Sequence, residues 1–293
     1  MSTTEVTPSA AAEQESSAQV VNDFSIEVAT VNGSGSQTAN TVLMRSIFQM
    51  GIPVSGKNLF PSNIAGLPTW FTIRASKQGY IGRKKDVDIL VAMNPETAKD
   101  DVVKLASGAA VVYDEPLKLN ELRSDLHFYA VPFDKLVAPV CPEARLRKLV
   151  RNMIYDGVLA HLLGIDFDEV HKALAKQFGA RKAKAAELNW NAVVAGRDFA
   201  AANLAKTDPY RVERMDKTAG KLIIEGNAAI IVLVPLLMPT VKLLGIDPIQ
   251  FGIIMILNLA IGCLTPPMGT VMFIANAITG TKVGEFVRES LPL

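Results

Sequence analysis

The chain is poor in the residues that hold metals and disulfides. It has two cysteines, Cys141 and Cys263, and three histidines in 293 residues. Iron–sulfur clusters and structural zinc sites use sets of such ligands, and disulfide frameworks use several cysteine pairs. The sequence therefore predicts no such centre, and a reducing, cytoplasmic setting is expected for residues 1–226. His161 and His171 lie ten positions apart with no third ligand nearby, which favours ordinary helix residues over metal ligands.

An excess of charge of one sign is also missing. Lys and Arg number 30 against 29 Asp and Glu, which leaves a formal net charge of +1. This balance gives no electrostatic footprint for nucleic acid, so no nucleic-acid partner is expected. Residues 1–23 contain neither a basic cluster nor an apolar core, and they predict a disordered tail rather than a signal peptide.

Charged side chains are absent from one long stretch near the carboxyl end. No Asp, Glu, Lys, Arg or His occurs between Pro248 and Thr281, whereas residues 145–221 are crowded with charge. Two regions of such different composition are typical of two different solvents, water for the first and an apolar surrounding for the second. The sequence thus divides near the phrase IEGNAAIIVLVPLLMP, which begins at Ile224.

Strands and helices alternate through the first part of the chain. The apolar run FSIEVATV predicts a strand, and the segment after it predicts a helix that ends at Gly51. The order repeats with a strand over 86–94, a helix that Gly108 closes, and further strands at GAAVVYDE and HFYAVPF. Alternation of this kind indicates an α/β fold, with a mostly parallel, Rossmann-like sheet covered on both faces. Residues 142–203 predict a helical extension, with Asp166 and Asp168 at the start of one helix.

A glycine-containing turn joins the first strand to the first helix. Glycines at this place let backbone amides approach a phosphate at a helix N-terminus, as in dinucleotide-binding folds. Two details oppose a nicotinamide cofactor: Thr38 stands where the third glycine is expected, and IPVSGK ends without an acidic residue. Two interpretations of this turn remain open. It is either a tight backbone turn that needs small residues or a contact for an anion or cofactor. The candidate cofactor-binding residues at this turn are Asn32, Gly33, Ser34, Gly35, Ser36, Gln37 and Thr38.

The next segment, residues 55–88, carries more turn-forming residues than a plain connection needs. It places Gly, Pro, Asn and Ser around Trp70, Phe71 and Arg74, and Arg74 joins the candidate cofactor contacts. The phrases GKNLFPSN, GLPTWFTIR and VAMNPET resemble the gamma-type domain at the N-terminus of the alpha subunit of 2-oxoacid:ferredoxin oxidoreductases, the 2-oxoglutarate enzymes in particular. The resemblance covers residues 24–227.

This resemblance implies an accessory domain rather than a complete enzyme. In that family a thiamine diphosphate domain decarboxylates a 2-oxoacid, electrons pass through iron–sulfur chemistry to ferredoxin, and coenzyme A takes the acyl group. The expected partners are therefore the other subunits of such an oxidoreductase, with ferredoxin reached indirectly. The resemblance assigns no catalytic residue to this chain, and coenzyme A and thiamine diphosphate are implied only for the complete complex.

The last part of the chain predicts apolar helices that are too short for simple membrane spans. Residues 228–244 would reach about 25 Å as a helix, against a hydrocarbon core of about 30 Å, and two prolines interrupt them. Residues 251–264 and 268–279 predict two half-helices of a membrane-type hairpin. The alternative is a buried helix pair joined by a proline turn. Exposed carbonyls at such a break can hold Na⁺ or a substrate. The candidate transport residues are Asn258, Gly262, Thr265, Pro266 and Pro267.

This part resembles the C-terminal part of the large permease subunit of tripartite ATP-independent periplasmic (TRAP) transporters. The phrases LLGIDPIQFG and GCLTPPMG carry the resemblance, which covers residues 227–293. It implies a hairpin loop in an elevator-like domain that transports organic acids with Na⁺, and membrane association through residues 228–281. The alternative function is therefore a fragment of such a permease. The predicted organisation is a tail (1–23), an oxidoreductase-type domain (24–226) and a permease-like segment (227–293).

Overall fold

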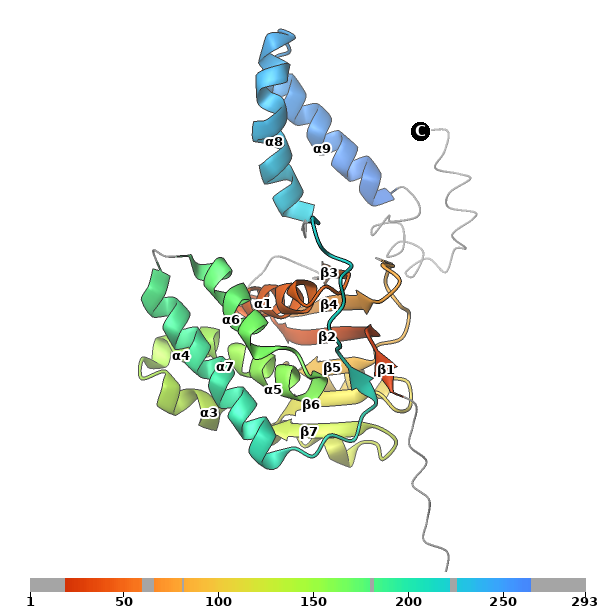
Figure 1. Ribbon diagram of the computed structural model, residues 1–293, viewed down its shortest axis with the longest axis vertical. Helices are drawn as coiled ribbons and strands as arrows, with labels where there is room; N and C mark the ends of the chain where they lie inside the picture. Colours follow the sequence, from red (N-terminus) through yellow and green to blue (C-terminus); the bar gives the residue numbers. More distant parts are fainter. Residues whose placement is uncertain (1–18, 60–65, 81, 180–181, 222–225, 265–293) are drawn as a thin grey trace, which may run out of the picture. The chain divides into compact units, whose positions relative to one another are not determined.

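The computed structural model describes residues 19–59, 66–80, 82–179, 182–221 and 226–264. The chain separates into two compact units, Met1–Ile223 and Ile224–Leu293, and each is described by itself. The first unit contains a six-stranded sheet with helices on both faces (Figure 1). Most of the predicted tail lies outside the described residues, and Val20–Val21 form the short strand β1.

The sheet is mostly parallel, as predicted, but it also contains antiparallel strands. The strands lie in the order β3-β4-β2-β5-β6-β7, and β2 (Asp23–Val31), β5 (Ile89–Ala92), β6 (Ala110–Asp114) and β7 (His127–Val131) run parallel. β3 (Val54–Leu59) and β4 (Pro68–Ser76) are antiparallel to their neighbours. The sequence of this segment is rich in turn-forming residues and did not predict its strands, because β3 is an edge strand with Gly, Lys and Asn in place of β-branched residues.

Two apolar cores cover the two faces of the sheet. Alternate residues of β2, such as Ile26 and Val28, pack under α1 (Ser36–Gln49) and the later helices. Ala29 and Leu90 belong to the second core, which α2 (Ala98–Val103) and the short helices η1 (Glu115–Leu117) and η2 (Leu119–Glu121) cover. Every residue of β5 is buried, as expected for a central parallel strand. α2 ends at Val103, well before the predicted end of this helix at Gly108.

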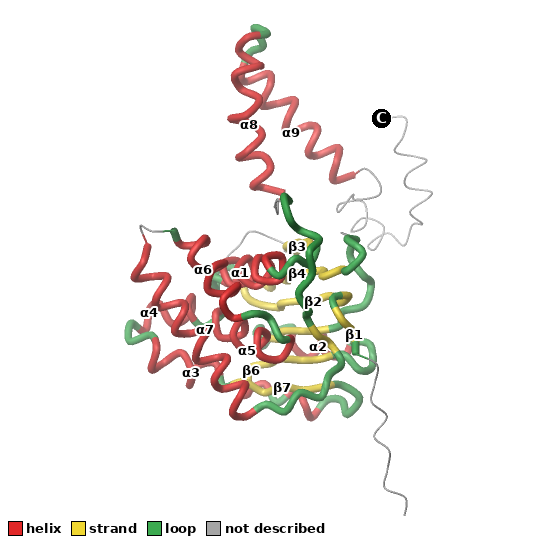
Figure 2. The backbone as a smooth tube through the Cα atoms, in the orientation of Figure 1, coloured by secondary structure: helices red, strands yellow, loops and turns green. Residues whose placement is uncertain are grey.

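Five helices follow β7 in the described chain, and the last four of them form the extension predicted over residues 142–203. The five helices are α3 (Phe133–Val140), α4 (Ala144–Val150), α5 (Met153–Leu163), α6 (Phe167–Phe178) and α7 (Ala183–Asn203). Figure 2 shows them gathered with α1 on one side of the sheet. The Asp166 side chain accepts a hydrogen bond from the Asp168 amide at 3.0 Å, which confirms the predicted cap of α6. α5 and α7 approach closely through Gly157 and Gly196.

A segment that we call the strap, residues 204–221, runs back along the domain after α7. Its strand β8 (Tyr210–Arg211) pairs in parallel with β1. The Val212 amide donates to the Leu163 carbonyl at 2.7 Å, and the Lys217 amide donates to the Gly51 carbonyl at 2.9 Å. These backbone hydrogen bonds connect segments far apart in sequence, so local periodicity could not predict the path of the strap.

The described residues of the second unit form two helices, α8 (Gly226–Leu243) and α9 (Pro248–Leu264). Gly245 adopts φ 69°, and the Asp247 side chain accepts hydrogen bonds from the amides of Ile249 and Gln250 at 2.8 and 3.1 Å, so a tight turn and an N-cap join the helices. In the described part of the chain, no helix combines the length and the apolarity needed to cross a bilayer. The predicted break at 265–267 and half-helix at 268–279 lie outside the described residues, and the membrane-type hairpin stays a prediction.

Candidate functional site

The glycine turn after β2 is the first element of the candidate site. Gly33 and Gly35 adopt φ of 82° and 83°, in the left-handed region that favours glycine. The Ser34 amide donates to the Val31 carbonyl at 3.1 Å, and the Thr38 amide donates to the Gly35 carbonyl at 3.2 Å. Gly35 is the N-cap of α1, and the first turn of α1 contains no acidic residue. The turn therefore presents the positive end of a helix whose own first turn carries no carboxylate.

A cavity of about 340 Å³ opens at this turn. Five of the seven predicted turn residues line it, and Ser34 and Thr38 do not. Every one of its nine described lining residues is uncharged, and most carry an amide or hydroxyl group that donates and accepts hydrogen bonds. The lining residues are Asn32, Gly33, Gly35, Ser36, Gln37, Asn40, Asn58, Thr69 and Leu149.

Strands β3 and β4 form one wall of the cavity. The Asn58 side-chain amide donates to the Gln37 side-chain oxygen at 3.4 Å, and the Thr69 hydroxyl donates to the Asn58 side-chain oxygen at 3.1 Å. These contacts tie the antiparallel pair to the first turn of α1. Asn58 and Thr69 were not predicted as site residues, because only the strand pairing brings them beside Gln37.

Residues at the start of α5 support the glycine turn through hydrogen bonds. The Asn152 side-chain amide donates to the Ser34 carbonyl at 2.7 Å, and the Tyr155 hydroxyl donates to the Asn40 side-chain oxygen at 2.8 Å and lies 3.3 Å from the Ser36 carbonyl. Asn152 and Tyr155 are buried, and burial raises the pKa of Tyr155 well above its ordinary value. They lie more than a hundred residues from the turn, and no sequence signal pointed to them.

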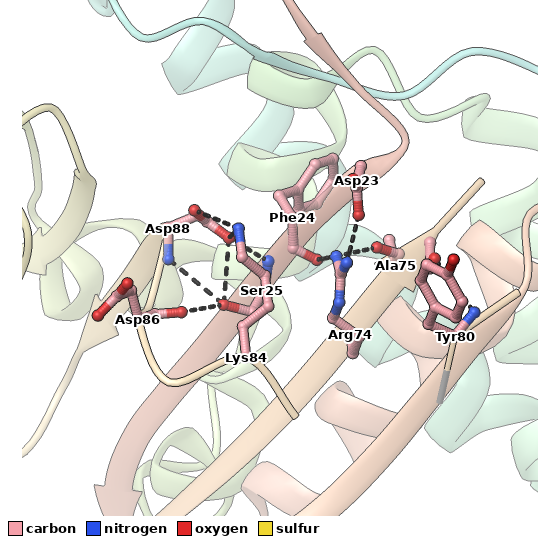
Figure 3. Close-up of polar contacts among 10 residues, drawn as sticks. Asp23, Phe24, Ser25, Arg74, Ala75, Tyr80, Lys84, Asp86 and Asp88 are labelled. Atoms are coloured by element: carbon pink, nitrogen blue, oxygen red, sulfur yellow. Dashed lines mark hydrogen bonds and ion pairs between the residues drawn. The ribbon is translucent and has the colours of Figure 1, made fainter. Parts of the chain in front are cut away.

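Arg74 does not lie with the other predicted cofactor contacts. It pairs across the sheet with Ser25, near the beginning of β2, whereas the turn follows the other end of that strand. Its guanidinium is bonded to the Asp23 carboxylate and donates to the carbonyls of Phe24 at 3.1 Å and Ala75 at 2.5 Å (Figure 3). The structure thus places the buried Arg74 in an ion pair with the partly exposed Asp23, and this pair connects β2 and β4.

A second polar group lies beside Arg74 at the same edge of the sheet. The Ser25 amide donates to the Asp88 carboxylate at 2.7 Å, and the Ser25 hydroxyl donates to the Asp86 carbonyl at 2.9 Å (Figure 3). Lys84 approaches the same Asp88 carboxylate at 3.0 Å. All of these polar groups are paired with each other, so the cluster connects β2 to the segment before β5.

The remaining predicted residues do not form a site in the described chain. Asn258 is exposed on α9 and Gly262 belongs to the same helix, while Thr265, Pro266 and Pro267 lie outside the described residues. Within the described residues, no three His, Cys, Asp or Glu side chains are grouped to hold a metal ion. His171 packs its ring 4.6 Å from the Trp190 ring, which is an ordinary helix-to-helix contact.

Asp156 is a buried acid that follows Tyr155 on α5, the helix that supports the glycine turn. Its side chain is fully buried on α5, and neither carboxylate oxygen has a hydrogen-bond partner among the described residues. Burial raises the pKa of Asp156 well above its ordinary value. The folded state therefore favours the neutral acid, and ionising Asp156 costs stability.

We expect stability to fall as pH rises because of this one group. Below the unfolded pKa of about 3.9 the acid is protonated in both states, and above it the folded chain loses stability until its own raised pKa is reached. Asp156→Asn keeps the shape and removes the ionisation. Urea unfolding at pH 4.5 and 7.5 should show a gain of about 1–3 kcal/mol for the variant at the higher pH and a smaller one at the lower pH. An equal effect at both pH values would contradict the assignment.

The first unit is a mixed α/β domain with a cavity at the carboxyl end of the central strand β2. Residues 25–199 match the family model described as pyruvate ferredoxin/flavodoxin oxidoreductase. The chain belongs to this family. A 2-oxoglutarate:ferredoxin oxidoreductase from Magnetococcus marinus shares the fold, with a TM-score of 0.60 at 24% identity over 67% of this chain and 34% of that chain.

The second unit has a different set of relatives. Residues 220–293 match the family model of the DctM component of tripartite ATP-independent periplasmic transporters. An isethionate TRAP transporter permease protein of Oleidesulfovibrio alaskensis is 46% identical over 69 residues, which are 24% of this chain and 11% of that protein. A C4-dicarboxylate TRAP transporter large permease protein of Pseudomonas aeruginosa is 45% identical over 76 residues and 18% of its length. The chain thus joins an oxidoreductase-type domain to a segment that is similar to a small part of TRAP permeases, as the two resemblances indicated.

Proposed function

We propose that residues 24–226 act as the accessory, gamma-type domain of a 2-oxoacid:ferredoxin oxidoreductase. In this proposal the other subunits carry thiamine diphosphate and the iron–sulfur clusters, and ferredoxin is met only through them. The domain contributes a binding surface next to the cofactors and is inactive alone. Family membership over residues 25–199 supports this role, and the fold shared with a 2-oxoglutarate enzyme agrees with it.

The observation that carries the proposal is the uncharged cavity at the start of α1. Its walls combine amide and hydroxyl side chains with the amino end of a helix, which favours ligands that carry negative charge or peptide-like groups. Coenzyme A has both kinds of group and, when bound in the complete complex, supplies the thiol that takes the acyl group. Asn32, Gln37 and Asn58 are the side chains of this chain that would hold it.

A binding measurement tests this proposal. Isothermal titration of the full chain with coenzyme A should give a signal that Gln37→Ala weakens about tenfold, because one hydrogen bond to a charged or polar ligand group is lost. Gln37 is exposed, so its replacement should leave the fold intact. Gln250→Ala, in α9, is the matched control. Binding that Gln37→Ala leaves unchanged would place the ligand elsewhere.

The full chain should not oxidise 2-oxoacids on its own. Its two cysteines are too few for an iron–sulfur cluster, which electron transfer to ferredoxin requires. We expect no coenzyme A-dependent reduction of a viologen dye by the purified chain, with or without added thiamine diphosphate. Measurable reduction by the chain alone would show that the accessory role is wrong.

We infer a second candidate function for residues 227–293, as a fragment of a TRAP permease. Its support is the identity of 46% over 69 residues, together with large exposed apolar side chains on both helices, such as Leu243, Ile249 and Ile256. This function would place residues 228–281 at a membrane and residues 1–226 in the cytoplasm. In a vesicle flotation assay the full chain should float with the lipid, and a chain ending at Lys217 should stay in the dense fraction. Equal behaviour of the two would remove this candidate.

A further inference from the structure

A second cavity, of about 260 Å³, lies between the end of α5 and the strap. It shares no residue with the cavity at the glycine turn. Two segments of the domain line it with charged and polar groups, and Gln19 adds a third segment from just before β1. The lining residues are Gln19, His161, Leu162, Leu163, Gly164, Lys206, Asp208, Pro209 and Arg211.

The side chains that line this cavity carry a net positive charge. Lys206 and Arg211 are cations, His161 is an imidazole at the end of α5, and Asp208 is the one carboxylate among the described lining residues. Arg211 lies 3.4 Å from Glu213, but both side chains are half exposed, so this ion pair is weak. The lining side chains therefore sum to one net positive charge, and Arg211, whose ion pair is exposed to solvent, is the cation more available to a ligand.

The Asp208 carboxylate is already occupied by groups of the protein. One oxygen accepts from the Tyr129 hydroxyl at 2.5 Å, and the other accepts from the Tyr210 amide at 3.0 Å and from Lys206 at 2.8 Å. Its side chain is only 2% exposed. Asp208 thus fixes Lys206 and the strap in place, and it has little capacity left to bind a cation from solution.

The end of α5 opposes an anion only weakly. A helix C-terminus carries about half a negative charge, less than one lysine or arginine offsets. Two of the last carbonyls are satisfied within the protein, since the Ile165 amide donates to Ala160 at 2.9 Å and the Val212 amide donates to Leu163 at 2.7 Å. The cationic side chains therefore dominate the field in the cavity.

We propose that this cavity binds a small dianion, of the phosphate or dicarboxylate type, through Lys206, Arg211 and His161. Its volume lies below the range of roughly 300–1,000 Å³ of pockets for drug-sized ligands, which selects small molecules. Lysine and arginine donate charge-assisted hydrogen bonds to both kinds of oxyanion. The proposed role of the glycine turn does not imply such a ligand, so the proposals for the two cavities are tested independently.

Binding here connects the strap to the body of the domain. His161 and Gly164 belong to the end of α5, whereas Lys206 and Arg211 belong to the strap. A ligand that contacts both segments binds the folded state and stabilises it by mass action. It also slows opening of the strap, so the amides of Val20 and Val212, which are hydrogen-bonded to Pro209 and Leu163, should exchange more slowly with solvent.

The test is a titration of the full chain with phosphate, pyrophosphate and succinate at constant ionic strength, followed by calorimetry and by hydrogen exchange. At least one of them should bind, with protection of the Val20 and Val212 amides, and comparison of phosphate with succinate distinguishes the two ligand types. Arg211→Gln should weaken binding about tenfold or more, since a hydrogen bond to a charged group is lost, and Arg211→Lys should restore part of it.

Lys176→Gln, an exposed charge on α6, is the matched control for a general loss of positive charge. Arg211 is half exposed on a two-residue strand, so its replacement should not unfold the domain, and circular dichroism checks this. If none of the three anions binds, or if Arg211→Gln and Lys176→Gln reduce binding equally, the proposal is wrong. Neither outcome bears on coenzyme A binding at the glycine turn.

Discussion

Replacement of Gly157 by alanine should remove a large part of the stability of the α/β unit. A Cβ atom at this position would lie 1.9 Å from the Val193 carbonyl oxygen and 2.7 Å from the Arg197 amide nitrogen, both on α7. Backbone atoms cannot rotate away, so α5 and α7 would have to move apart. Overpacking of this kind costs about 3 kcal/mol or more, against a typical stability of about 5–15 kcal/mol.

Urea unfolding followed by circular dichroism measures this loss. Gly82→Ala is the matched control, because a Cβ atom at Gly82 meets nothing within 4 Å and its φ is not positive. Gly196→Ala should behave like Gly157→Ala, since its Cβ atom would lie 2.1 Å from the Ile154 carbonyl oxygen on the opposite helix. A loss below about 1 kcal/mol at both positions would contradict the close approach of the two helices.

Replacement of Gly35 by valine should damage the turn that forms the first cavity. Gly35 has φ 83°, and a Cβ atom there would lie 3.0 Å from Leu149 Cδ2 and 3.3 Å from Leu149 Cα. A β-branched residue with positive φ costs about 1–3 kcal/mol through backbone strain, and the contact with the backbone of α4 adds to it. The melting temperature should fall, and coenzyme A binding should fall with it, because the turn lines the cavity.

Two controls separate the causes. Gly108→Val carries the same kind of strain, at φ 81°, but its Cβ atom meets nothing within 4 Å, so the difference between the variants measures the Leu149 contact. Ser34→Ala removes a buried hydroxyl that has no partner among the described residues, and it should leave the melting temperature nearly unchanged. If Gly35→Val keeps the wild-type melting temperature yet loses coenzyme A binding, the turn serves the ligand rather than the backbone.

Local signals predicted much of the first unit. The apolar run of β2, the stop at Gly51 and the cap at Asp166 each depend on residues within a few positions, so periodicity and capping chemistry locate them. Local signals did not predict the antiparallel pair of strands β3 and β4. Its edge strand lacks the β-branched pattern, and strand direction depends on pairing across the sheet rather than on any residue of the strand.

The candidate site was predicted in part for the same reason. Asn32, Gly33, Gly35, Ser36 and Gln37 line the cavity, because a strand, a tight turn and a helix that follow each other in sequence also meet in space. Arg74 was placed wrongly beside them. It follows a turn-rich segment in the sequence, but the antiparallel direction of β4 carries it to the far end of β2, where Asp23 pairs with it.

The sequence by itself determined that the chain has two parts of different chemistry, that the first is an α/β domain, and that a glycine turn begins its first helix. These properties follow from composition and from interactions between near neighbours. Only the tertiary structure decided that Asn58, Asn152 and Tyr155 support that turn, and that Lys206 and Arg211 line a second cavity together with His161. Such groups are assembled by sheet pairing and helix packing between distant segments, and no local pattern records which distant residues will meet.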